Sequence, residues 1–431
     1  MLEELSIEEF NEFSRNHEQG LFFQSSYWGE LKKFTGWVPH IVGIKEGYNI
    51  KGATLLLAKK IPIFNRYIFY APRGYLLNYK DEKFLTDFTK KIVKYVKRKH
   101  GIFIKINPNI SYQDRDVDGN IVGENNNQQI IDNLIKLGYK HNGFTITYGT
   151  DLEPRWWSVL DLKNKTEEEI LKNMRGTTRW GINNSYKHGL KLIDIDEKRI
   201  EEFKNLMEHT SERRGFIDRP ISYYKKMYEC FSENNNIKIL LVELNLDENI
   251  KSLNIQLENT KEKLNKATKE NVVKEYKSQI EAVNKKIDEA NEIKKEYGNT
   301  IVVAGGLFML FGKQVVSLFG ASYREFMKFN GQYFLNYEMI KYALNNGYEK
   351  FNFFGITGEF NEESNNYGLF NFKRGFGAEV VELIGEFNLV TDKLFNVVYK
   401  LMYKVYRKMK RWLYDRDSKW SCRIWGKKRS N

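Results

Sequence analysis

The residues with the clearest capacity for chemistry gather in two short segments near the end of the chain. The first is Phe353-Phe354-Gly355-Ile356-Thr357-Gly358, and the second is Phe370-Asn371-Phe372-Lys373-Arg374-Gly375-Phe376-Gly377. Together they combine aromatic rings, two adjacent cations and closely spaced glycines, and glycine lets a backbone approach a bound molecule closely. We interpret these two segments as the floor of an active site.

Several widespread catalytic and cofactor motifs are absent from the sequence. It contains no Walker A loop, no G-x-G-x-x-G dinucleotide motif, no G-x-S-x-G elbow and no acetyl-CoA pyrophosphate signature. The six histidines are scattered and Cys230 and Cys422 are isolated, so neither residue type predicts a metal site or a disulfide. The sequence therefore argues against phosphoryl transfer, hydride transfer and serine hydrolysis. It favours a reaction without metal or cofactor that depends on positioning and electrostatics.

Length and composition indicate a multidomain globular protein. The chain has 431 residues, 41% of them hydrophobic, which predicts two or three domains with substantial cores. No run of 18 apolar residues is present, and the acidic start Met1-Leu2-Glu3-Glu4 lacks the apolar region of a signal peptide. We therefore expect a cytoplasmic location.

Positive charge is concentrated at the carboxyl end. The net charge of the chain is +13, and residues 404–431 contain eleven Lys and Arg against two Asp, a local net charge of +9. Such a surplus attracts a polyanion, either nucleic acid or an anionic membrane. The run Leu394–Trp412 also alternates apolar and basic residues at helical spacing. This favours an amphipathic helix at a membrane interface, and the alternative is a helix docked on the protein with a solvated basic face.

A heptad-like run in the middle of the chain interrupts the globular pattern. Residues recur every three or four positions in two series: Ile250, Leu253, Leu257, Leu264 and Ala267, with Thr260 filling one step, then Tyr276, Ile280, Val283, Ile287 and Ala290. This is the seam of a coiled coil. Because strand-like segments flank the run, we predict an antiparallel helical hairpin over residues 246–298, which returns the chain to its origin. The alternative is one long helix of a dimer.

The remaining chain alternates between helix-like and strand-like segments, which predicts an α/β fold. A helix expected at Phe84–Lys99 precedes a strand at Gly101–Asn107, and a helix at Phe334–Asn345 precedes a strand at Lys350–Phe354. Both helices open on Phe-Leu, and both strands contain an asparagine. We interpret the two units as a duplicated module, with chance convergence as the alternative. Between them, Thr166–His188 predicts helices with a basic face.

A set of ordered blocks resembles the Fem-type (FemABX) peptidoglycan interpeptide-bridge aminoacyltransferases. The blocks cover residues 20–390 and are Phe23-Gln24-Ser25, Glu30-Leu31-Lys32, Gly36-Trp37, Tyr70-Ala71-Pro72-Arg73-Gly74, Ser158-Val159-Leu160-Asp161-Leu162, Ile170-Leu171-Lys172-Asn173-Met174, Thr210-Ser211-Glu212-Arg213-Arg214-Gly215-Phe216 with Arg219, Phe351-Asn352-Phe353-Phe354-Gly355-Ile356-Thr357-Gly358 and Phe372-Lys373-Arg374-Gly375-Phe376. No single block is decisive, but the ordered set is specific.

The resemblance implies a fold and a function. It implies two N-acetyltransferase-like (GNAT-type) domains with mixed sheets plus a coiled-coil arm. The first domain would contain residues 1–152 and 393–431, the second residues 153–245 and 299–392, and the arm residues 246–298. It also implies transfer of an amino acid from aminoacyl-tRNA to the stem peptide of lipid II or a UDP-linked muropeptide, at the inner face of the plasma membrane. A second copy of the chain or a related Fem-type enzyme is a further expected partner.

The family pattern also implies site residues. Lys32, Arg219 and Tyr223 would contact the phosphates and sugar of the precursor, and Tyr323 would contact the substrate. Phe372 would stack on the terminal adenine of tRNA, and Lys373 would stabilise the developing oxyanion.

The chain departs from the family pattern at one position. Many members have Asp where this chain has Asn107, and Asn cannot act as a general base. The hypothesis that follows is that the substrate and tRNA carry the proton themselves, and the alternative is that another group serves as base. Asn352 occupies the matching place in the second module.

Two other functions fit parts of the sequence. One is a non-catalytic scaffold that binds tRNA or membrane and a partner of the arm. The other is a related tRNA-dependent transferase with a lipid or protein acceptor.

Overall fold

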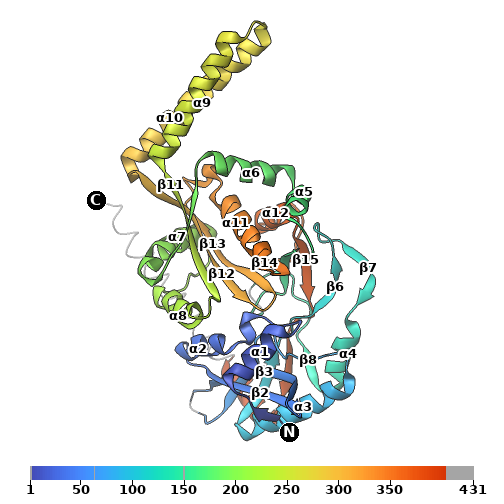
Figure 1. Cartoon of the computed structure of the whole chain (residues 1–431). Helices are drawn as coiled ribbons and strands as arrows, with labels where there is room; N and C mark the ends of the chain where they lie inside the picture. Colours follow the sequence, from blue (N-terminus) through green and yellow to red (C-terminus); the bar gives the residue numbers. More distant parts are fainter. Residues whose placement is uncertain (1, 63, 149–150, 404–431) are drawn as a thin grey trace, which may run out of the picture.

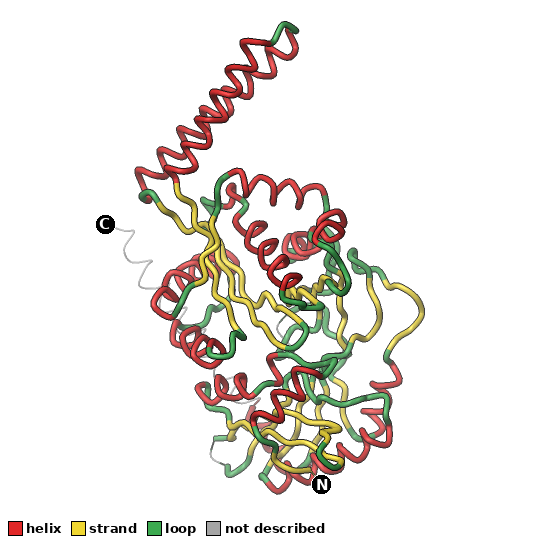
Figure 2. Tube along the Cα trace, viewed as in Figure 1, coloured by secondary structure: helices red, strands yellow, loops and turns green. Residues whose placement is uncertain are grey.

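The computed structural model describes residues 2–62, 64–148 and 151–403 and contains two β-sheets, helices around them and a projecting helical arm (Figures 1 and 2). Cys422 and the basic sequence after residue 403 lie outside the described residues. The expected α/β class with mixed sheets is confirmed.

The first sheet has seven strands. Their spatial order is β1 (Leu2–Glu4), β2 (Val38–Glu46), β3 (Asn49–Lys60), β4 (Tyr67–Ala71), β5 (Gly101–Ile106), β16 (Phe387–Val390) and β8 (Tyr139–His141). The helices of this part of the chain are α1 (Ile7–Asn16), α2 (Ser26–Phe34), α3 (Glu82–Arg98) and α4 (Gln128–Lys136). Helices α3 and α4 pack apolar faces against this sheet, because Phe88, Ile92 and Leu134 are buried with Ile104 of β5.

The second sheet has nine strands. Their order is β10 (Lys191–Asp194), β11 (Ile237–Asn245), β12 (Thr300–Phe311), β13 (Gln314–Ser322), β14 (Lys350–Ile356), β9 (Trp156–Asp161), β15 (Glu379–Leu383), β6 (Ser111–Arg115) and β7 (Ile121–Asn126). The associated helices are α5 (Glu167–Asn173), α6 (Gly176–Lys187), α7 (Ile200–Arg214), α8 (Ile221–Ser232), α11 (Gly331–Asn345) and α12 (Tyr367–Gly375).

The two sheets share one unit of topology. In the first sheet, β4 and β5 are parallel and α3 connects them; in the second, β13 and β14 are parallel and α11 connects them. Parallel neighbours need such a crossover helix. These are the two helix–strand units that the sequence suggested as a repeat, so the structure supports the duplicated module.

The chain crosses between the sheets more often than the expected domain boundaries allow. Strand β16 inserts between β5 and β8 of the first sheet, although its residues precede the expected boundary at 392. Strands β6 and β7 come from the first 152 residues but extend the second sheet through β15. Isolated sequence patterns cannot show this exchange, because strand partners are set by tertiary contacts. The sheets also share a hydrophobic core in which Trp28 of α2 and Leu55 of β3 pack with Tyr224 of α8.

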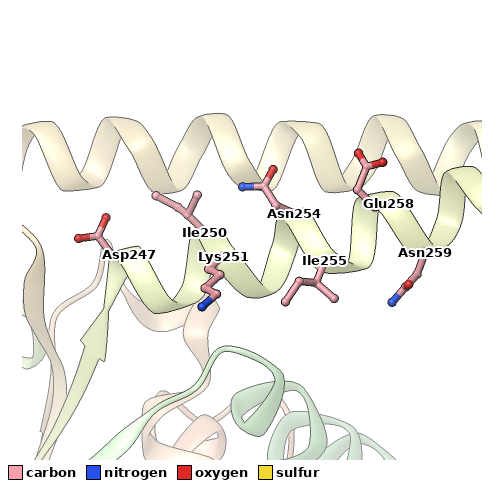
Figure 3. A pocket seen from close by; sticks show the side chains of 7 residues that line it. All are labelled: Asp247, Ile250, Lys251, Asn254, Ile255, Glu258 and Asn259. Carbon is pink, nitrogen blue, oxygen red and sulfur yellow. The ribbon is translucent and has the colours of Figure 1, made fainter.

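The arm is a helical hairpin, as predicted. Helix α9 (Leu246–Lys266) and helix α10 (Glu270–Tyr297) pack against each other and project from the second sheet (Figure 1). Leu253, Leu257 and Val283 are buried along the seam. A shallow groove on α9 is lined by Asp247, Ile250, Lys251, Asn254, Ile255, Glu258 and Asn259 (Figure 3), and it contains none of the expected site residues.

The base of the arm is fixed to the body. Leu246 and Ala290 are buried in the core of the second sheet, and Asn249 donates a 3.0 Å hydrogen bond to the carbonyl of His188. Glu289 of α10 forms a 2.8 Å ion pair with Lys328 of the body. The direction of the arm is therefore set by packing at its base.

Candidate functional site

Lys32 and Arg219 converge on one buried tyrosine at the interface of the two sheets. Helix α2 begins after Ser25, whose hydroxyl accepts a hydrogen bond from the Trp28 amide, and the helical period places Lys32 one turn beyond Trp28. The Lys32 Nζ lies 4.2 Å from the centroid of the Trp28 ring and 5.9 Å from that of Tyr223 on α8. The Arg219 guanidinium lies 5.5 Å from the same Tyr223 ring. The structure therefore brings these three predicted residues together.

A carboxylate completes this group. Burial raises the pKa of Glu153. The positive charges of Arg73, Lys32 and Arg219 oppose this rise. Burial lowers the pKa of Lys32 to about 8, although the Glu153 charge opposes the shift. Among the described residues, no hydrogen bond or ion pair engages the side chains of Lys32, Arg219 or Glu153. The group therefore combines charged side chains that are held near one another without being paired.

Arg73 connects the first domain to the start of β9. The residue is 2% exposed, and its φ of 54° lies in the left-handed region. Its Nη2 donates a 2.6 Å hydrogen bond to the Pro154 carbonyl, and its guanidinium lies 4.5 Å from the Trp157 ring centroid. Its Nε has no hydrogen-bond partner among the described residues. A buried arginine whose Nε–H has no partner can still donate a hydrogen bond to an anionic ligand.

Asn107 supports the turn that contains Arg73. Its Oδ1 accepts hydrogen bonds from the Arg73 amide at 2.8 Å and from the Tyr70 hydroxyl at 3.2 Å. In the second module, the Asn352 Oδ1 accepts a 2.7 Å hydrogen bond from the amide of Phe354, whose φ is 63°. Both asparagines therefore hold a residue of unusual backbone conformation at the end of a parallel strand pair.

Lys373 lies buried on α12 with its ammonium group fixed. Its Nζ donates hydrogen bonds to the carbonyls of Gly355 at 2.7 Å and Phe354 at 3.3 Å. Burial lowers the pKa of Lys373 to about 7. The neighbouring Phe372 is half-buried, and its ring packs edge-on against Tyr333 with centroids 5.1 Å apart. A lysine ammonium has three donors, so two carbonyls leave one N–H of Lys373 for a further acceptor.

The segment from Pro154 to Trp157 links the two groups. Gly355 pairs with Trp157 across β14 and β9, and the rings of Phe354 and Trp157 are 5.8 Å apart. A Cβ on Gly355 would lie 2.7 Å from Pro154, so a larger residue would clash there. One side of the segment binds Arg73, and the other supports the carbonyls that hold Lys373.

Tyr323 lies in different surroundings. Its ring contacts His209 and Phe326, with centroids 5.1 and 6.0 Å apart, and it is half-buried. Burial is the main cause of its raised pKa, and the charges of Glu325 and Glu202 add to the shift. Among the described residues, no hydrogen bond or ring contact joins Tyr323 to Lys32 or Lys373.

Sequence reasoning missed Glu153, Arg73 and Trp157 as members of the site. Arg73 lies within the Tyr70–Gly74 block that carried part of the resemblance, and this was the available signal. Glu153 lies between two strands in a stretch without a motif, and only the tertiary structure brings it near Lys32.

Comparison with known proteins identifies a family for the chain. The sequence matches the FemAB family over residues 5–404.

The chain belongs to the FemAB family.

A FemA aminoacyltransferase of Staphylococcus aureus (strain MRSA252) is 32% identical over 413 residues, covering 93% of this chain and 98% of the relative. A crystal structure of FemX aligns with a TM-score of 0.77 and 27% identity over 93% of this chain and 99% of FemX. The chain is therefore a FemAB-family acyltransferase, and the FemX alignment shows that it shares the mixed α/β fold of that protein.

Two negative findings apply to the described residues. None of their helices is long and apolar enough to cross a membrane. They also contain no cluster of three or more His, Cys, Asp or Glu residues that could hold a metal ion.

Proposed function

We propose that this FemAB enzyme transfers an amino acid from aminoacyl-tRNA to the stem-peptide amine of a peptidoglycan precursor, either lipid II or a UDP-linked muropeptide. The observation that carries the proposal is the convergence of Lys32 and Arg219 on Tyr223 without an ion-pair partner among the described residues. Two unpaired cations beside an aromatic ring suit a diphosphate and its sugar. Arg73, buried nearby, is available to add a third positive charge.

The reaction needs no external energy source, because the donor is an activated ester. The amine nitrogen attacks the ester carbonyl carbon and forms an amide bond, and the bond from that carbon to the ribose oxygen of tRNA breaks. The amine loses one proton, and the ribose oxygen gains one. Lys373 stabilises the negative charge that develops on the carbonyl oxygen through its remaining N–H.

The proton transfer does not use Asn107. Its Oδ1 already accepts two hydrogen bonds, and an amide has no basic capacity near neutral pH. We therefore retain the hypothesis that the amine and the ribose oxygen exchange the proton directly or through water.

The tRNA end would approach along α6 and α12. Lys172 of α5 and Arg175, which precedes α6, are exposed, and the Arg175 amide donates a 2.9 Å hydrogen bond to the Gly375 carbonyl at the end of α12. Trp180 on α6 is 65% exposed and offers a stacking surface. Phe372 lies on α12 beside Lys373 and would contact the terminal adenine. We assign Tyr323 a contact with the distal part of the substrate, and the enzyme a peripheral position at the inner face of the plasma membrane.

The test is transfer of a radiolabelled amino acid from charged tRNA to lipid II, UDP-linked muropeptide and a phospholipid, assayed side by side. We expect transfer to a peptidoglycan precursor that ribonuclease abolishes. Lys32→Met and Arg219→Met should raise KM for the precursor, whereas Lys33→Met should not, because Lys33 is exposed and pairs with Glu30 at 2.5 Å. Absence of transfer with every charged tRNA would disprove the proposal. Labelling of the phospholipid alone would mean that the acceptor is a lipid and not a peptidoglycan precursor.

A further inference from the structure

The helix formed by residues 393–403 presents an apolar stripe to the surface. Leu394, Val397 and Leu401 are 72%, 56% and 59% exposed. Their spacing of three and four positions places them on one face of the helix. An exposed apolar face at helical spacing is a surface suited to insertion into another apolar phase.

The opposite face of this helix is held against the first sheet. The Arg66 guanidinium lies 4.1 Å from the Phe395 ring centroid, and the rings of Tyr399 and Phe103 are 5.6 Å apart. Asn396 is only 7% exposed. The docked face fixes the rotation of the helix, so the apolar stripe points away from the protein.

The helix lies at one end of the first sheet. Strand register shows which residues share this end: Val38 pairs with Ala58, Lys60 pairs with Tyr67, and Tyr67 pairs with Gly101. The start of β2, the end of β3 and the starts of β4 and β5 therefore meet here, next to Phe103 and the helix.

Exposed cations lie at this same end of the sheet, those of α3 on the face opposite the helix. They are Lys60 on β3, Lys97, Arg98 and Lys99 at the end of α3, and Lys393 at the start of the helix. Among them, Lys99 pairs with Glu4 at 3.6 Å. Val38, which is 50% exposed, adds apolar surface at the same edge. We call these residues together with the stripe the docking end.

The sequence beyond the helix strengthens the positive charge. The family match ends at residue 404, and residues 404–431 add a net charge of +9. The basic extension therefore goes beyond what defines the family. An apolar stripe flanked by cations complements an anionic bilayer, in which apolar side chains enter the acyl boundary and Lys and Arg contact acidic headgroups.

We propose that the docking end binds an anionic membrane surface, with Leu394, Val397 and Leu401 inserted and the cations of the docking end on the headgroups. The proposal deepens the peripheral position stated above and names its surface. It also orients the enzyme. Strands β4 and β5 lead from the docking end to Arg73 and Asn107, so these two residues lie roughly one strand length, ~16 Å, from the bilayer.

The same orientation suits a lipid-linked substrate. Lys32 lies one helical turn from Thr35, whose carbonyl accepts a 2.6 Å hydrogen bond from Lys59 next to the docking end. The helix that carries Lys32 therefore reaches the docking end. A precursor anchored by a lipid diphosphate would meet Lys32 first and extend its peptide toward the transfer site.

The experiment is flotation of the full chain with vesicles of phosphatidylcholine alone or with about one third phosphatidylglycerol. We expect binding to the anionic vesicles that weakens with added salt. The variant Leu394→Ser/Val397→Ser/Leu401→Ser should bind at least tenfold more weakly. Ile255→Ser, at an exposed apolar residue of the arm, is the matched control and should bind as the unchanged chain does. Activity on the soluble UDP-linked precursor and the melting temperature should be unchanged in all variants.

Three results would overturn the proposal. They are no binding of the unchanged chain to anionic vesicles, equal binding of the triple-serine variant, and a change from dimer to monomer in that variant, which would make the stripe an interface between copies. Because flotation needs no transfer activity, a failed membrane test and a failed transfer test remain distinguishable.

Discussion

Lys373 combines a buried ammonium with a pKa near neutrality. Burial lowers its pKa to about 7, so the charged form that would stabilise an oxyanion is lost as pH rises through that value. We predict that kcat for transfer to the soluble precursor falls on the alkaline side with an apparent pKa near 7. Lys373→Met should lower kcat by about 10²-fold or more, since one lost donor to an oxyanion costs that much.

The control for this prediction is Lys373→Arg. Arginine stays charged throughout the accessible pH range, so the alkaline fall should disappear in whatever activity remains. If the alkaline limb persists unchanged in Lys373→Arg, another group titrates.

Glu153 controls the charge of Lys32. Its negative charge opposes the effect of burial on the Lys32 pKa, so Glu153→Gln should lower that pKa below about 8. Lys32 would then lose its proton closer to neutral pH, and KM for the precursor should rise severalfold between pH 7 and 8 while kcat changes little. Steady-state kinetics across this range tests the prediction. Glu46→Gln, at an exposed carboxylate, is the control; equal KM values in both variants would remove Glu153 from substrate binding.

At the residue level, the resemblance grouped residues that the structure brings together, and their roles stay a prediction. Lys32, Arg219 and Tyr223 were expected to act together, and they converge. That Glu153 lies beside these cations could not be predicted, because Lys32, Arg73 and Arg219 come from three distant segments of the chain.

In the proposed function, helix α6 would face the approaching tRNA. Trp180 is 65% exposed on it, and the basic residues Lys172 and Arg175 precede the helix. Loss of one base-stacking ring typically costs about 1–3 kcal/mol. We therefore predict that Trp180→Ala raises KM for aminoacyl-tRNA by about tenfold without changing KM for the precursor. Tyr48→Ala removes a fully exposed aromatic ring of the first domain and should leave both constants unchanged.

At the scale of elements, the spacing of apolar residues was enough to predict helices but not the order of strands in the sheets. The seam residues of the arm predicted α9 and α10 because each helix packs mainly on the other. The position of β16 was not predictable, since its four residues suit either sheet and only their pairing with Ile106 and His141 decides between them.

At the scale of the whole molecule, the chain crosses between the sheets at two places: β16 joins the first sheet, and β6 and β7 join the second. Glu386, 2% exposed, ties them together: its Oε1 accepts a 2.7 Å hydrogen bond from the Leu152 amide, and its Oε2 pairs with Lys105. Breaking a buried ion pair by removing one partner typically costs about 3–5 kcal/mol. We predict that Glu386→Ala lowers the free energy of unfolding by about this amount in urea denaturation.

The comparison for this prediction is Glu258→Ala on the arm. That carboxylate forms an exposed pair with Lys261 at 2.8 Å, and an exposed pair contributes less than about 1 kcal/mol. Equal stability losses in the two variants would mean that the crossings are not joined through Glu386. A loss confined to Glu386→Ala would support one cooperative unit that includes both sheets.

The insertion of β16 between β5 and β8 also determines when the first sheet can form during synthesis. Strand β8 ends at His141 and β16 begins at Phe387. At about 5–20 residues per second, a ribosome needs roughly 12–50 s to cover that interval. Until then, β5 has an open edge and β8 has no neighbour in the sheet. During that interval the nascent chain exposes an unpaired strand edge to chaperones or to other chains, because β16 is translated after every other strand of the first sheet.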